Sequence, residues 1–197
     1  MTVDVEPNLA PPGAGLPAVE RHIGRLLLAV QRWTGTRDSF HARFRQEREL
    51  IQQLVRSCDP ASAATRVLIP RPRGLEDSSR YWSVLMTLDH LRIINHSVDK
   101  IIGALAKGIV PPGVSSTANV KPSTTVTAAV IPEYEAACDA LLATVAAAPQ
   151  LKTAVRYAHP WFGPLDAWGW YALAGVHMGL HRAQIEQILE HLPAAKK

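Results

Sequence analysis

The feature that most constrains the fold is a long helical pattern at the end of the chain, WGWYALAGVHMGLHRAQIEQILEHL. Asp166 can cap its first turn and Pro193 follows its end, so the pattern predicts a helix from about Ala167 to His191. A helix of about 25 residues spans ~37 Å, the size of a whole domain. Other helices are therefore needed to cover its apolar side, as in a helical bundle.

Apolar residues recur at intervals of three or four elsewhere in the chain, and no segment predicts a strand. Thr34-Gly35 interrupts the first pattern, so the sequence is compatible with two helices or with one kinked helix. Ser78 or Ser79 is suited to cap a later helix, and Pro132 is an alternative start for the next one. The predicted helices cover residues 17–33, 38–57, 78–107 and 125–147. The chain is thus expected to be all-α, a bundle of four main helices with an extra N-terminal helix.

Residues 1–16 are rich in Pro and Gly and are expected to form a disordered N-terminal arm, with a single domain over residues 17–193. This arm has an acid where a signal peptide carries basic residues, and it has no apolar core. No stretch approaches the ~18 unbroken apolar residues of a membrane-spanning helix. Cys58 and Cys138 lie far apart and form no redox or zinc motif. We therefore expect a cytoplasmic protein with reduced thiols and no membrane partner.

The formal net charge is +4 at pH 7, but the basic residues are spread along the chain and form no nucleic-acid-reading module. No nucleic-acid partner is expected, whereas a small anionic substrate fits this charge. Arg71 and Arg73 lie in the loop 59–77, and loops of this length in compact domains are often functional. With Arg80 they are candidates for holding an anionic thiol or substrate. The alternative is that they are solubilising surface arginines.

Three histidines fall on the apolar sides of two predicted helices. His177 and His181 are four residues apart and share a face with Leu173. His90 lies on the apolar stripe of the earlier helix, whereas His96, six residues later, is turned away. A buried imidazole is costly unless its nitrogens find partners, and a metal ion supplies a partner for several rings. Three histidines would leave coordination positions open, as in a catalytic metal site.

Each of these residues also has a simpler interpretation. An HxxxH pair alone is weak evidence for a metal, and the three residues are also compatible with a buried hydrogen-bonded cluster that binds none. The remaining histidines are interpreted as surface, capping or loop residues: His22, His41, His159 and His191. His159, in the loop HPWFGPL, also suits a hydrogen-bond donor or proton relay. Asp89 points about 100° away from its neighbour His90 on a helix, so no general base or other catalytic residue is assigned.

The segment HPWFGPLDAWGWYALAGVHMGLHRAQIEQI resembles the final helix of the DinB-like (YfiT-like) family of metal-binding bundles. SRYWSVLMTLDHLRII similarly resembles the family's second bundle helix, so the resemblance spans about residues 70–192. It implies an up-down-down-up four-helix bundle, often dimeric, that binds Zn²⁺ or Ni²⁺. Under this resemblance His90 is the first ligand, His177 and His181 are the closing pair, and Gln184 is the glutamine that follows them.

The family also implies an activity. Members resemble transferases or isomerases that use low-molecular-weight thiols, such as bacillithiol or mycothiol. The expected function is therefore a metal-dependent transferase, or a hydrolase if the metal activates water. A non-catalytic metal-binding bundle, acting as a sensor, a store or a structural dimer, is the alternative. Gly169 and Gly175 lie inside the predicted last helix, where glycine is less favourable than alanine, and they either let another group approach closely or have no role.

Overall fold

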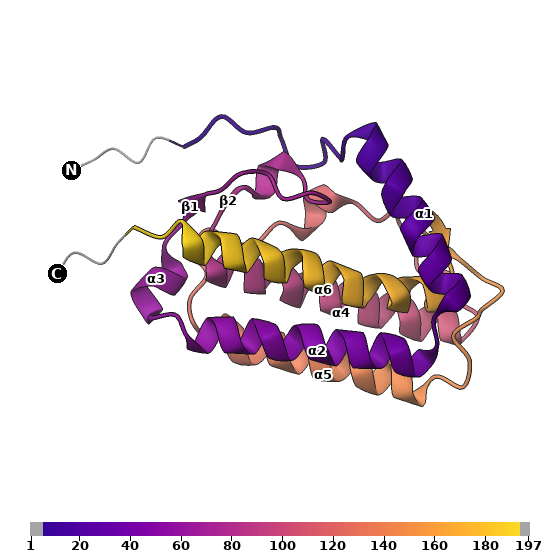
Figure 1. The fold of residues 1–197 in the computed structure, drawn as a ribbon. Helices are drawn as coiled ribbons and strands as arrows, with labels where there is room; N and C mark the ends of the chain where they lie inside the picture. The colour runs from indigo at the N-terminus through magenta and orange to yellow at the C-terminus, as the bar shows by residue number, and fades with distance from the viewer. Residues whose placement is uncertain (1–5, 194–197) are drawn as a thin grey trace.

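The computed structural model describes residues 6–193, and within them four long helices pack side by side as a bundle (Figure 1). They are α2 (Arg37–Arg56), α4 (Val84–Ala106), α5 (Val130–Ala147) and α6 (Ala167–Glu190). Asn95 bonds to Cys138 and to Met178, while Gly103 lies beside Thr144. The α4–α5 pairs advance together along both helices, so α4 and α5 are parallel. The His90 ring lies 4.5 Å from that of His181, whereas Asn95 lies at Met178, so α4 and α6 are antiparallel.

The direction of α2 completes the arrangement. Its Glu47 pairs with Arg182 of α6, and its Arg43 lies beside Gly175 of the same helix, so α2 and α6 are parallel. The chain is therefore an up-down-down-up four-helix bundle, which confirms the predicted fold class. Its core lies between the four helices, and burying each large apolar side chain stabilises it by about 1.5–3 kcal/mol. Fully buried members include Phe44, Leu88, Leu91, Leu141 and Ile185.

The first two helical patterns form two helices and not one kinked helix. α1 (Ala18–Thr34) crosses the bundle steeply near one end (Figure 1). A side chain at Gly35 would overlap the Phe40 ring, and Thr36 and Ser39 cap each other at the start of α2. The sharp break therefore depends on the glycine and on the capping box that follows it.

The apolar stripe of α1 is not buried in the core. Ile23 and Leu27 are 53% and 63% exposed, and Leu28 is the buried residue of this helix. One turn further along the helix, Gln31 donates to the Ala172 carbonyl oxygen and Arg32 pairs with Asp166 at 3.0 Å. The apolar side of α1 therefore lines a cavity beside the bundle and is not packed into the core.

Short elements connect the helices. They are α3 (Pro60–Ala64), the 3₁₀ turns η1 (Asp77–Ser79) and η2 (Thr117–Val120), and the strands β1 (Val67–Leu68), β2 (Tyr81–Trp82), β3 (Tyr157–His159) and β4 (Gly163–Leu165). β1 pairs with β2 and β3 pairs with β4, both antiparallel. The prediction of no strand was wrong, because ribbons of two or three residues are too short to show an alternating pattern.

The predicted start of the helix 78–107 was also wrong. The Ser83 hydroxyl accepts from the Met86 amide and caps α4 there, while Ser79 lies in η1 and Trp82 pairs with Val67. The prediction failed because a local capping pattern does not include the strand pairing that holds Trp82 extended. The start of the last helix is confirmed, since Asp166 accepts from the Gly169 amide at 2.9 Å.

The predicted 125–147 helix starts late, at Val130, so Pro132 is in its first turn. At the other end of the chain, the described part of the 1–16 segment forms neither helix nor strand, and the Ala14 amide closes a turn by donating to the Pro11 carbonyl oxygen. Ala10 donates its amide to Asp77, and Gly13 and Gly15 donate theirs to Glu76. Residues 1–5 lie outside the described residues.

The glycines of α6 allow close approach. A side-chain carbon at Gly169 would lie 3.0 Å from Arg32 Nε, and one at Gly179 would lie 2.9 Å from Glu47 Oε1. Gly175 leaves ordinary contact room for Arg43. The described helices include none long and apolar enough to span a membrane. Cys58 and Cys138 form no disulfide.

Candidate metal centre

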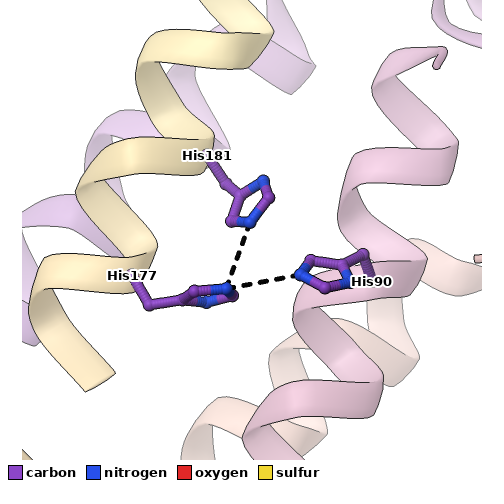
Figure 2. A group of neighbouring side chains, drawn as sticks. All are labelled: His90, His177 and His181. Atoms are coloured by element: carbon purple, nitrogen blue, oxygen red, sulfur yellow. Dashed lines mark hydrogen bonds between the residues drawn. The ribbon is translucent and has the colours of Figure 1, made fainter. Parts of the chain in front are cut away.

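His90 of α4 faces His177 and His181, which lie one turn apart on α6 (Figure 2). His177 Nε2 lies 3.3 Å from His90 Nε2 and 3.1 Å from His181 Nε2. Nitrogen ligands at the usual zinc–nitrogen bond length lie ~3.3–3.4 Å apart around a tetrahedral ion. The two distances are therefore close to those between ligands of one metal ion, and the structure brings the three predicted residues together.

Hydrogen bonds fix the orientation of two of the rings. His90 Nδ1 donates to the Val120 carbonyl oxygen of η2 at 2.7 Å. Gln184 donates from Nε2 to the Ser79 carbonyl oxygen, so its Oε1 is the acceptor for His181 Nδ1, also at 2.7 Å. Since a carbonyl can only accept, both rings carry their proton on Nδ1. Their Nε2 lone pairs therefore point into the cluster, the state that binds metal.

The third ring, that of His177, cannot satisfy the hydrogen bonding of the whole cluster. His177 Nδ1 is buried and has no hydrogen-bond partner within residues 6–193. A proton on His177 Nε2 can satisfy one neighbouring lone pair well, and a proton on Nδ1 satisfies neither. A cation that accepts all three Nε2 lone pairs resolves the conflict. The donor set therefore fits a divalent metal ion better than it fits a self-contained hydrogen-bonded cluster.

Burial keeps these histidines neutral. Desolvation lowers the pKa of His90 to about 4, although its bond to Val120 acts in the opposite direction. Desolvation also holds the pKa values of His177 and His181 well below 6.5, and the neighbouring rings lower them further. All three rings are therefore neutral at pH 7, as metal binding requires.

Neighbouring residues support the cluster. The Trp82 ring is nearly parallel to that of His181, with centroids 6.2 Å apart, and it also contacts His90. Lys121 lies over the Trp82 ring and pairs with the buried Glu76 at 3.3 Å. Because Lys121 directly follows Val120, this ion pair helps to hold η2 and the carbonyl oxygen that orients His90.

A cavity of about 1260 Å³ borders all three histidines. It is larger than the roughly 300–1,000 Å³ of most small-molecule sites. Its walls come from α1, α6, η2 and the β3–β4 hairpin, and they include the apolar side chains Ile23, Leu27, Trp161, Phe162 and Trp170. The cluster is therefore open to a space that can hold a small molecule.

The three candidate substrate-binding arginines lie in different environments. Arg73 lines the cavity, and no ion pair of its side chain is found among the described residues. Arg71 is held by Glu20 and by the Leu75 carbonyl oxygen, and Arg80 bonds to Asp77. Their substrate role stays a prediction, and of the three only Arg73 borders the cavity.

Several residues of the site were missed or only partly predicted. Lys121 and Arg43 also line the cavity, but their segments show no motif. The role of Val120 depends on a backbone carbonyl, which no side-chain pattern reveals. Asp89 is buried, pairs with Arg92 and accepts from the Ser123 amide, so it anchors the chain that follows η2.

Comparison with known proteins shows the fold but not the family. No family model matches the chain, and no curated protein matches it. Among solved structures, it is similar to TT2238, described as a four-helix bundle protein, with a TM-score of 0.57 and 22% identity. The match covers 77% of this chain and 98% of that one. At this identity the likeness supports the shared bundle and says nothing of activity.

Proposed function

We propose that this chain is a metal-dependent enzyme of the DinB-like (YfiT-like) type, in which His90, His177 and His181 hold one Zn²⁺ or Ni²⁺ ion. Its reaction would be the transfer of a low-molecular-weight thiol to a small electrophile, or a hydrolysis. The observation that carries the proposal is the convergence of three Nε2 atoms at the edge of a large cavity. A purely structural metal site is usually closed by four protein ligands.

A divalent ion held by neutral imidazoles would lower the pKa of a bound thiol or water and so supply a nucleophile near neutral pH. The protein's own contribution is to fix the ligands and to exclude water. The hydrogen bonds from His90 to Val120 and from His181 to Gln184 hold two rings in place. The apolar cavity walls shelter the reactants, and Arg73 lies where an anionic group of a thiol or substrate can reach it.

A non-catalytic metal-binding bundle is the second hypothesis. It uses the same three histidine ligands as the enzyme hypothesis, but it does not explain why a large cavity adjoins them. The homodimer and the cytoplasmic location expected from the sequence stay predictions.

Elemental analysis of protein purified without a His tag tests the metal site. Close to one Zn or Ni per chain is expected, and the double variant His177→Ala/His181→Ala should contain none. His22→Ala is the control, because His22 is exposed on α1 and lies outside the cluster. If neither protein contains metal or takes it up on titration, both metal hypotheses are wrong.

Activity separates the two metal hypotheses. The metal-loaded protein is mixed with each thiol and with a panel of small electrophiles and esters, and product is followed by mass spectrometry. Turnover that is lost in the double variant supports the enzyme. Tight metal binding without thiol affinity or turnover instead favours the sensor, store or structural role.

A further inference from the structure

His159 lies at the end of β3, where three aromatic rings fix it. Its ring stacks on Phe162 with centroids 4.8 Å apart, and it also contacts Trp161 and Trp170. His159 pairs with Gly163, and this pairing sets the register of β3 on β4. The residue is therefore held rigidly at the cavity wall, which it lines.

The hairpin is itself held against α1. Phe162 packs on Gly24, where an added side-chain carbon would lie 3.2 Å from the ring. Arg25 Nε donates to the Trp161 carbonyl oxygen at 2.6 Å. Trp170 Nε1 donates to the Tyr157 carbonyl oxygen and joins the hairpin to α6. His159 thus has a defined position between two helices that form walls of the same cavity.

A backbone hydrogen bond determines which nitrogen of His159 carries the proton. The Trp161 amide donates to His159 Nδ1 at 3.1 Å, so Nδ1 bears the lone pair and Nε2 bears the hydrogen. Burial lowers the pKa of His159 to about 4, which keeps the ring neutral at pH 7. Nε2 has no hydrogen-bond partner among residues 6–193. The cavity wall therefore includes a histidine whose ring N–H has a fixed orientation.

We propose that His159 donates a hydrogen bond from Nε2 to an oxygen atom of the molecule that binds in this cavity. That molecule is a small aromatic or apolar compound carrying a carbonyl or similar acceptor. The apolar side chains Ile23 and Leu27 and the aromatic hairpin residues suit its body. The inference rests on the proposed function in taking this cavity as the substrate site, and it makes His159 a substrate-positioning residue.

A purely structural role is the competing explanation, since the bond to Trp161 also stabilises the turn. Two variants separate the roles. In His159→Asn the side-chain oxygen can take the place of Nδ1 and keep the bond from Trp161, but the distal donor is lost. In His159→Gln the amide nitrogen reaches the place of Nε2 and keeps the donor, while the bond from Trp161 is lost.

The probes are acetophenone and ethylbenzene, which have similar shapes but differ in one carbonyl oxygen. Their dissociation constants are measured with metal-free protein by NMR titration of the Trp161 and Trp170 indole signals. In His159→Asn, acetophenone binding should weaken about fivefold, the effect of one hydrogen bond of ~1 kcal/mol, while ethylbenzene binding changes less than twofold. His159→Gln should keep most of the acetophenone affinity.

Three results would overturn the proposal: equal weakening of both probes in His159→Asn, unchanged acetophenone binding in that variant, or no binding of either probe in the cavity. Because the protein is metal-free, a failure of the metal site does not affect this titration. A failed metal analysis with a positive titration therefore refutes the proposed enzyme and leaves the ligand site standing.

Discussion

Replacing Gln184 by Met tests how the metal centre is oriented. Gln184 is fully buried and connects the Ser79 carbonyl to His181, with 2.7 Å for each bond. Methionine has nearly the same volume, so the change removes two hydrogen bonds and leaves little cavity. It leaves one buried acceptor and one buried donor unsatisfied, at about 1–3 kcal/mol each. The metal-free variant should therefore be destabilised by about 2–6 kcal/mol.

The same change should weaken metal binding, because His181 is no longer held with its Nε2 lone pair toward the cluster. Loss of a residue that orients a metal ligand typically costs 10–100-fold in affinity, of order tenfold or more here. Urea unfolding gives the stability, and competition with a zinc chelator gives the affinity. Each is measured on the purified variant alongside the unmodified protein.

Gln187→Met is the matched control. Gln187 lies on the same helix, and its buried Oε1 has no hydrogen-bond partner within the described chain. Its replacement removes an unsatisfied acceptor, so the stability should stay unchanged or rise slightly. The reasoning is refuted if Gln184→Met loses less than about 1 kcal/mol and binds zinc normally, or if both variants behave alike.

Three further predictions concern other parts of the chain. The folded state lowers the pKa of His90 from 6.5 to about 4, so the unfolded chain binds more protons. His90 alone should cost the metal-free protein about 3 kcal/mol of stability as the pH falls through that range, and His177 and His181 add to the loss. Constant urea midpoints between pH 7.5 and 5 would contradict this. Gly103→Ala should raise stability by up to about 1 kcal/mol in urea unfolding, because the new methyl group meets its neighbour at an ordinary 3.5 Å. Arg71→Ala should destabilise the protein by about 1 kcal/mol, because Glu20 loses its ion-pair partner. Arg73→Ala should leave the stability nearly unchanged and weaken the binding of an anionic thiol. Urea unfolding measures the stability of both variants, and a thiol titration measures the binding.

The bundle and its histidines could be predicted because their signals are local. Periodic apolar positions give the long helices, and a side-chain cap at Asp166 gives the start of α6. His177 and His181 lie on one helix, so spacing alone puts them on the same face. His90 could be placed on an apolar stripe, but its meeting with the pair needed the packing of α4 on α6.

The remaining features depend on contacts between distant segments. Ser79 was expected to start a helix, yet its carbonyl is used by Gln184, more than one hundred residues later in the chain. The partner of His90 is the backbone of Val120, which any residue type would supply. The cavity depends on the angle at which α1 crosses the bundle, and no periodicity encodes that angle.

The position of α1 separates two properties of the protein. The metal ligands belong to α4 and α6 inside the bundle, whereas part of the cavity wall belongs to a helix outside it. Ile23 and Leu27 of α1 are not part of the packed core, unlike Leu28. Substitutions there can change the size and chemistry of the accepted molecule at little cost to folding or to the histidines. One bundle of this kind can thus acquire new ligands by changes confined to its first helix.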